Sequence, residues 1–83
     1  MVDKIKIGDL VLQIWYDGEK AIIQCTKLKN DDGTDILGGI PIKILEEGIT
    51  PVLRVGFYSY CVKDSLVKNY KIRDENDAFV YLI

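Results

Sequence analysis

The sequence predicts a small, mainly β domain, either a small barrel or a strongly bent antiparallel sheet. The 83 residues are about one domain's length, and 48% of them are hydrophobic. Ile and Val recur in short alternating runs, which is the pattern of strands with one buried face. Gly, Asp and Pro separate these runs where the chain would turn. No internal repeat or linker divides the chain, so we expect residues 1–83 to form a single β-rich domain.

The clearest predicted element is a β-hairpin, whose two strands and turn are Leu10–Tyr16, Ala21–Leu28 and Asp17-Gly18. An Asp-Gly pair favours a two-residue type I′ turn. That turn places Leu12 opposite Ile23. Because side chains alternate along a strand, these two residues share an apolar core face. The other face carries Gln13 and Trp15, and we expect it to meet solvent or a partner.

Shorter patterns flank the hairpin. Lys4–Ile7 is a short strand or a lead-in that bends at Gly8, and residues 29–35 form a polar loop around Asp32-Gly33. Gly38-Gly39 would be a flexible point. Ile40–Ile44 alternates and predicts a strand that starts at Pro41 or lies at a sheet edge, because proline lacks an N–H. A short helix over residues 42–47 is the alternative.

The second half predicts one long strand and a hairpin. Pro51 opens the strand Val52–Val62, in which Gly56 marks a bend and Leu53, Val55 and Phe57 face the core. Helical spacing of apolar residues allows one short helix near 64–70. The chain end predicts a second hairpin, with strands at 70–73 and 78–83 around the polar loop 74–77.

These elements add up to five to seven short strands in a body of SH3-like or OB-like barrel size. The segment Ile7–Val11 resembles the opening of SH3-like barrels. A Gly-Asp pair before a strand is too common to assign a family.

The residue inventory excludes several chemistries. The chain has no histidine, so Ser-His-Asp and Cys-His arrangements cannot form within it. Two cysteines cannot supply a four-thiolate zinc site, and no Gly-rich phosphate loop occurs. An EF-hand alignment of the acidic loop puts Leu28 and Gly39 where carboxylates are required. We therefore expect no enzyme, no metal site and no cofactor, and we interpret both acidic clusters as solvated turns.

Cys25 and Cys61 fall on the predicted core side of their strands, where thiols pack as small hydrophobic groups. No secretory segment opens the chain and no run reaches the length of a membrane span. These features favour a cytoplasmic protein with reduced thiols and no membrane contact. Eleven Lys and Arg stand against 13 Asp and Glu, and the basic residues are scattered, which makes nucleic acid an unfavoured partner.

Four aromatic residues on faces away from the predicted core are the candidate partner- or ligand-binding residues, namely Trp15, Tyr16, Tyr58 and Tyr60. Tyr and Trp are enriched at binding hot spots and also stack on bases. Three interpretations stay open: these side chains fill the interior, form a protein interface, or form a surface for a small ligand or a base.

The function that we expect is that of a non-enzymatic interaction domain, which binds a protein partner through an apolar, aromatic face and self-associates as a homodimer. The apolar content exceeds what so small a domain readily hides, unless its core is unusually dense. One alternative is a small viral or mobile-element inhibitor or ligand-sequestering protein. Another is a nucleic-acid-binding barrel with a basic stripe beside Tyr58 and Tyr60.

Overall fold

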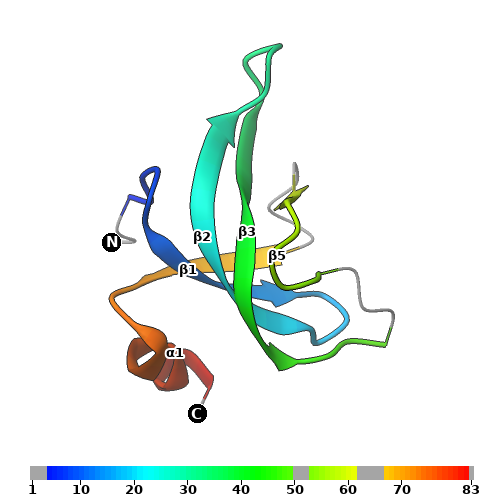
Figure 1. Ribbon diagram of the computed structural model, residues 1–83, viewed down its shortest axis with the longest axis vertical. Helices are drawn as coiled ribbons and strands as arrows, with labels where there is room; N and C mark the ends of the chain where they lie inside the picture. The colour runs from blue at the N-terminus through cyan, green and yellow to red at the C-terminus, as the bar shows by residue number, and fades with distance from the viewer. Residues whose placement is uncertain (1–3, 50–52, 62–66, 83) are drawn as a thin grey trace.

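The protein is mainly β and forms one strongly bent antiparallel sheet, as predicted (Figure 1). The computed structural model describes residues 4–49, 53–61 and 67–82. The five strands lie in the order β4-β3-β2-β1-β5, so the described strands do not close into a barrel. The strands and the helix that follows them are β1 (Leu10–Trp15), β2 (Lys20–Lys29), β3 (Asp35–Glu46), β4 (Ser59–Cys61), β5 (Val67–Ile72) and α1 (Glu75–Leu82).

The predicted hairpin is present as β1 and β2, but its register is shifted by one residue. Leu12 lies opposite Ile22, not opposite Ile23. The turn has three residues, since the Trp15 N–H donates to the Glu19 carbonyl at 2.8 Å. Gly18 has φ of 93°, and no described non-glycine residue has a positive φ, so the type I′ turn is excluded.

The β2–β3 connection repeats this turn. The Gly33 N–H donates to the Asn30 carbonyl at 3.0 Å, and Gly33 has φ of 85°. The Asp32 carboxylate accepts the Thr34 N–H at 2.9 Å, as the Asp17 carboxylate accepts the N–H of residue 19 at 3.0 Å in the first turn. The predicted polar loop is therefore confirmed, and each Asp-Gly pair supplies both a side-chain acceptor and a residue with positive φ.

Side chains are buried on both faces of the sheet. The inner face carries one apolar cluster, formed by Val11, Ile23, Cys25 and Leu37, with Ile5 and Leu28 packed against it. The helix face carries a second cluster, formed by Leu12, Ile22, Ile72 and Ala78, with Leu10, Ile14, Leu45 and Tyr70 packed against it. The prediction of one core face and one mixed face is wrong for this reason. Gln13, expected on the mixed face, is buried.

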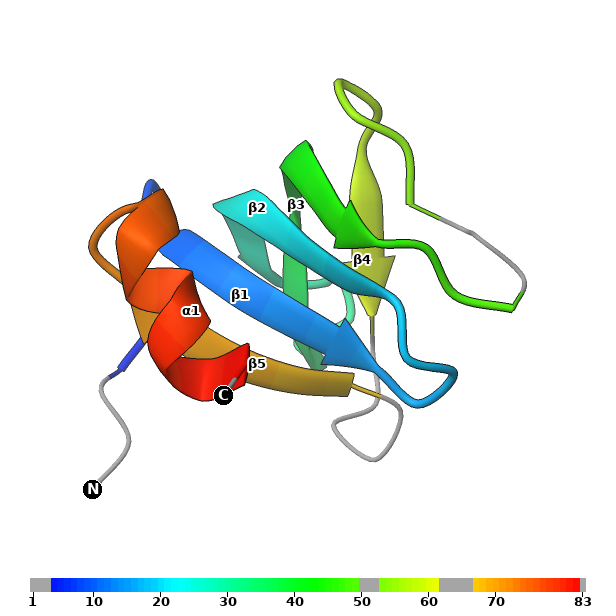
Figure 2. The same ribbon diagram turned by 90° about the horizontal axis from the view of Figure 1, so that it is seen from below.

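The chain end forms α1 and not the predicted hairpin. The Asp74 carboxylate accepts the Asp77 N–H at 3.0 Å, and the Asp77 carboxylate accepts the Arg73 N–H at 3.0 Å, so two acids cap the start of the helix. Tyr81 of α1 stacks on Tyr70 of β5 with ring centroids 4.5 Å apart, and the helix lies against the sheet (Figure 2). The short helix allowed near 64–70 is not found over 67–70, which belong to β5, and residues 64–66 lie outside the described residues.

Strand β3 runs through Gly38-Gly39, which were predicted to be a flexible point, and through Pro41, where the strand was predicted to start or to lie at a sheet edge. A Cβ atom on Gly39 would collide with the backbone of Gln24, so glycine here permits a close approach of two strands. Pro41 lies beside a register shift in the β2–β3 pair, where a missing N–H is tolerated. The alternative helix over residues 42–47 is wrong, because residues 42–46 continue β3.

The predicted strand over residues 52–62 survives only as β4, and its two end residues lie outside the described residues. Leu53 is buried as expected, but Val55 and Phe57 are exposed because residues 53–58 form a loop. The lead-in before β1 turns at Gly8, as predicted.

Candidate protein-interaction surface

Most of the exposed large hydrophobic side chains in the described part of the chain lie in two places. We define the β3 patch as Ile40, Ile42, Val55, Phe57 and Tyr58, from β3 and the 53–58 loop. We define the helix patch as Phe79, Val80 and Tyr81, three exposed hydrophobic residues of α1. Clustered exposed apolar groups of this kind mark interaction sites more often than isolated ones do.

A backbone hydrogen bond brings together the two segments of the β3 patch. The Gly56 N–H donates to the Pro41 carbonyl at 3.0 Å. The isoleucines of the patch flank Pro41 in sequence, and Val55 and Phe57 flank Gly56, so four apolar residues lie around one contact. A turn closes the loop, because the Phe57 N–H donates to the Arg54 carbonyl at 3.1 Å and Gly56 has φ of 84°.

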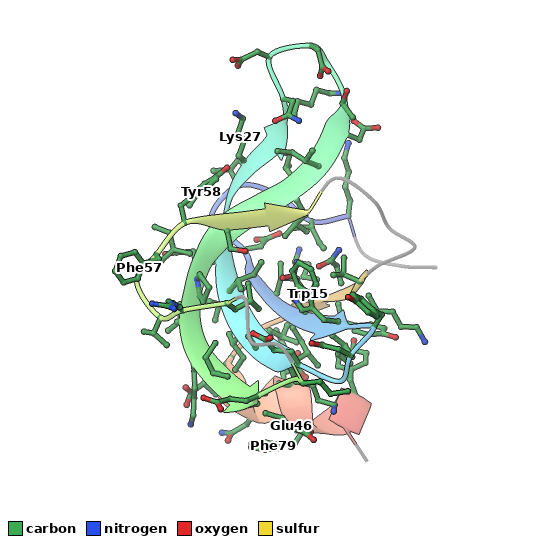
Figure 3. All side chains as sticks on the ribbon, turned by 90° about the vertical axis from the view of Figure 1, so that its right-hand side faces the viewer. Trp15, Lys27, Glu46, Phe57, Tyr58 and Phe79 are labelled. Carbon is green, nitrogen blue, oxygen red and sulfur yellow. The ribbon has the colours of Figure 1, made fainter. Side chains whose placement is uncertain are left out.

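The patch side chains are well exposed. Phe57 is 69% exposed and Val55 is 55% exposed, and Figure 3 shows Phe57 and Tyr58 at the side of the molecule. Full burial of a side chain such as Phe stabilises a protein by about 1.5–3 kcal/mol relative to exposure. Much of that free energy is still available to an association that covers the patch.

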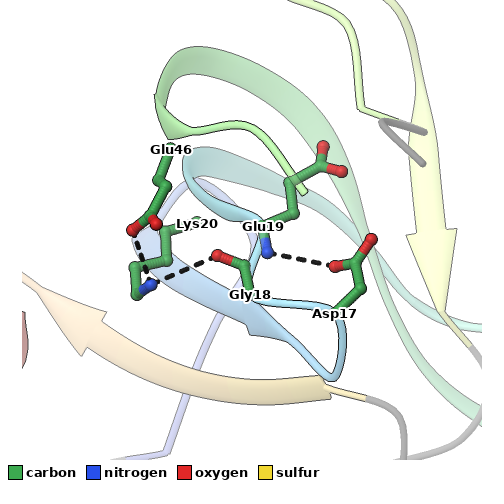
Figure 4. A network of polar contacts seen from close by, with 5 residues as sticks. All are labelled: Asp17, Gly18, Glu19, Lys20 and Glu46. Carbon is green, nitrogen blue, oxygen red and sulfur yellow. Dashed lines mark hydrogen bonds and ion pairs between the residues drawn. The ribbon is translucent and has the colours of Figure 1, made fainter. Parts of the chain in front are cut away.

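The loop that carries the patch is anchored at its start. Leu53 is buried, and its N–H donates to the Glu19 carboxylate at 3.0 Å. Glu19 is itself fully buried, which is rare for a carboxylate and requires hydrogen-bonding partners. It lies directly after the β1–β2 turn, and its side chain points away from the Lys20–Glu46 ion pair of 2.7 Å (Figure 4). Sequence reasoning missed this residue, because nothing in its local pattern separates it from a solvent-exposed glutamate.

The four aromatic residues predicted as binding residues do not form one site. Trp15 is half-buried on the inner face and donates its indole N–H to Gln13 at 2.8 Å. Tyr16 is exposed on the β1–β2 turn, whereas Tyr58 belongs to the β3 patch. The side chain of Tyr60 lies outside the described residues. Figure 3 shows Trp15 well apart from Phe57 and Tyr58, so only Tyr58 of the predicted set contributes to the patch.

Several lysines are engaged with carboxylates. Lys20 pairs with Glu46 at 2.7 Å, Lys29 with Asp35 at 2.7 Å, and Lys43 with Glu75 at 3.7 Å. Lys29 lowers the pKa of the Asp35 carboxyl through its hydrogen bond and its charge. Within the described residues, no group of three or more acidic or cysteine side chains could hold a metal ion.

The Cys25 thiol lies in the inner-face cluster and is buried, as predicted. Burial raises the pKa of the thiol above its ordinary value, although a contact of 3.9 Å with the Lys27 carbonyl opposes the shift. A thiolate is the reactive form of cysteine, so this environment favours an inert packing role. The Cys61 side chain lies outside the described residues.

Compared with known proteins, the chain matches no family model, no curated protein and no solved structure. In the parts of the chain that the structure describes, no helix has the length and apolar content needed to cross a membrane.

Proposed function

We propose that this protein is a non-enzymatic interaction domain that binds a protein through the β3 patch, with a second copy of the chain as the partner. The observation that carries the proposal is the exposure of Phe57 and Val55 on a loop tied to β3 by the Gly56–Pro41 hydrogen bond. A surface that is already ordered loses little conformational entropy on binding. An anchored aromatic loop is therefore well suited to association.

A second copy suits the chemistry of the patch. In a two-fold dimer the same surface meets itself, and contact between apolar groups requires no opposite charges. Large aromatic side chains at the centre of such a contact contribute most of the binding free energy. Phe57 and Tyr58 supply two of them in adjacent positions.

The helix patch is the rival surface, and the surroundings favour the β3 patch over it. Val80 is 68% exposed, as much as Phe57. Beside α1, however, a hollow of about 420 Å³ is lined by three apolar residues, Phe79, Ile44 and Leu45, and by three charged ones, Lys20, Lys43 and Glu46. These charges would have to lose water in a contact centred on the helix, which disfavours burial there.

Light scattering after size exclusion, over a range of micromolar concentrations, tests the proposal. We expect a concentration-dependent dimer for the natural sequence, a monomer for Phe57→Ser, and a retained dimer for Val80→Ser, the equally exposed control. Circular dichroism checks that both variants keep the β-rich fold. A monomer at every concentration contradicts the proposal, as does a dimer that Val80→Ser disrupts and Phe57→Ser does not.

A further inference from the structure

Strand β5 lies at one edge of the sheet and pairs with β1 alone (Figure 2). The hydrogen bonds of β1 show which backbone groups of β5 face outward. Odd-numbered residues along β1 bond to β2, because the Trp15 N–H donates to the Glu19 carbonyl at 2.8 Å and the Asp9 carbonyl accepts from Cys25 at 2.9 Å. Backbone groups of successive residues point to opposite sides of a strand, so the even-numbered residues of β1 bond to β5.

Three residues of β5 therefore direct their backbone N–H and carbonyl groups away from the sheet. The even-numbered residues of β1 lie opposite Lys68, Tyr70 and Ile72, so these three bond to β1. The alternate residues, which face outward, are Val67, Asn69 and Lys71. Within the described residues, no hydrogen bond uses their backbone groups. A row of unpaired groups of this kind is a template for a further strand.

The space beside this edge is open. Val67 and Asn69 line a hollow of about 310 Å³ that lies between β5 and the first residues of β3. The bent sheet stops short of closing here, which leaves room alongside β5 for an extended chain, since neighbouring strands are spaced about 4.7–4.9 Å apart.

The surroundings of the edge are basic. β5 carries Lys68 and Lys71 and no acidic residue. The lead-in that precedes β1 brings two further lysines, Lys4 and Lys6. It lies beside β5, because the Asp9 carboxylate accepts the backbone N–H of Lys6 at 2.7 Å and pairs with Lys71 at 3.6 Å.

Most of this positive charge is not neutralised by the protein itself. The side chains of Lys4, Lys6 and Lys68 are exposed, and none has an ion-pair partner among the described residues. Asp35 also lines the hollow, but Lys29 pairs with it at 2.7 Å and offsets its charge. The chain as a whole has a net charge of -2, so the edge of β5 is a local exception.

An acidic partner suits this edge better than a second copy of the chain. Pairing β5 with β5 of another copy would gather the lysines of both chains along one seam, and like charges on adjacent strands are destabilising. A strand that carries Asp or Glu would meet opposite charges while its backbone extends the ladder.

We propose that the outer edge of β5 binds an acidic peptide in extended conformation, which adds a sixth strand to the sheet. Backbone hydrogen bonds to the three outward residues supply affinity, and Lys68 with the lead-in lysines selects acidic side chains. This edge lies at the opposite end of the strand order from β4 and uses no residue of the β3 patch. It therefore stands or falls independently of the proposed dimer.

Amide hydrogen exchange, followed by NMR on the ¹⁵N-labelled protein, tests the proposal. The probe is an end-capped peptide of sequence TEVEVEVT, which alternates glutamate with strand-forming residues. We expect saturable binding that slows exchange at the three outward residues of β5 and changes little at the alternate three, which already bond to β1. Attraction between charges alone would not produce this alternation.

Two further peptides separate the backbone from the charge. TKVKVKVT keeps the strand-forming residues but reverses the charges, and it should bind at least about tenfold more weakly. A TEVEVEVT peptide that is N-methylated at alternate residues keeps its charges but loses the backbone donors of one edge, and it should lose the protection pattern.

Variants locate the site. Lys68→Glu should weaken TEVEVEVT about three- to tenfold, the effect of reversing one exposed charge. Lys27→Glu is the control, because it changes the net charge equally but lies on the side of the molecule that carries Tyr58 (Figure 3). It should leave the affinity unchanged, as should Phe57→Ser, which removes the proposed dimer contact.

Four outcomes would overturn the proposal. They are the absence of saturable binding by TEVEVEVT, equal binding of TKVKVKVT, and equal weakening by Lys68→Glu and Lys27→Glu. The fourth is protection of the outward amides that rises with protein concentration without any peptide, since a second copy would then occupy the edge.

Discussion

The buried carboxylate of Glu19 accepts the backbone N–H of Leu53 at 3.0 Å and thereby ties the β1–β2 turn to the loop that carries the β3 patch. The two residues are 34 positions apart, so the bond joins segments that no local pattern connects. Removing the carboxylate leaves a buried N–H without its partner and opens a void.

We expect Glu19→Ala to lower the free energy of unfolding by about 2–4 kcal/mol, because it combines lost packing with an unsatisfied buried donor. Glu19→Gln keeps an acceptor oxygen of the same shape and should cost less. Urea denaturation of the three proteins measures the difference. A Glu19→Ala variant as stable as the natural protein would show that the anchor is unimportant.

The close approach of β2 and β3 gives a second prediction. A Cβ atom on Gly39 would meet backbone atoms of Gln24, including its carbonyl carbon at 3.0 Å. Backbone cannot move aside cheaply, so Gly39→Ala should lower the free energy of unfolding by about 1–3 kcal/mol. The measurement is again the urea midpoint and slope.

Gly48 supplies the matched comparison. A Cβ atom there would meet the carboxylate of Asp17, which is a side chain and can be shortened. Gly48→Ala should therefore cost less in the background of Asp17→Ala than alone, and a double-mutant cycle should show coupling. Additive effects at Gly48 and Asp17, or a Gly39→Ala variant of undiminished stability, would count against these packing contacts.

Acid should weaken the β2–β3 turn. Hydrogen bonds from Thr34 lower the pKa of Asp32 below its ordinary value of 3.8, and the Lys29 contact does the same for Asp35. A carboxyl whose pKa is lower in the folded state adds stability above its unfolded pKa, and this contribution is lost as the pH falls through the folded pKa. We expect the urea midpoint to fall below pH 4 and to fall less steeply in Asp32→Ala. A parallel pH dependence in both proteins would contradict this assignment.

Alkali should act through Cys25. Burial raises the pKa of its thiol above 9.0, so folding favours the neutral form. The corresponding stability is present below the unfolded pKa and is lost as the pH rises towards the folded pKa. We expect the urea midpoint to fall as the pH rises above 9.0, and to fall less steeply in Cys25→Ala. The variant should also leave the number of rapidly labelled thiols in the native protein unchanged, and remove one of two in denaturant. Loss of a fast-reacting native thiol in the variant would show that Cys25 is accessible.

The sequence was informative where pattern and turn chemistry are local. Alternation identified β1 and β2, and the Asp-Gly pairs located both turns. The predicted register was wrong, because an Asp-Gly pair suits a two-residue type I′ turn and also a three-residue turn in which only Gly18 has a positive φ. One residue's difference exchanges the faces of β2 relative to β1, so Ile23 lies with Val11 and not with Leu12.

The prediction for the chain end was wrong for another reason. Apolar residues over 78–83 fit a strand, but the caps made by Asp74 and Asp77 favour a helix, and packing of Ala78 and Tyr81 against the sheet completes it. The acids were interpreted only as a turn. The β3 patch was beyond prediction, because it depends on the long-range contact between Gly56 and Pro41.

The most direct test of the proposed interface is an NMR sample in which ¹³C-labelled and unlabelled chains are mixed in equal amounts. If the β3 patch joins two copies, intermolecular nuclear Overhauser effects will connect the rings of Phe57 or Tyr58 to the methyl groups of Ile42 or Val55, and Phe57→Ser will abolish them. Intermolecular effects confined to Val80 and its neighbours on α1, or none at concentrations where the natural protein is fully folded, would contradict the account.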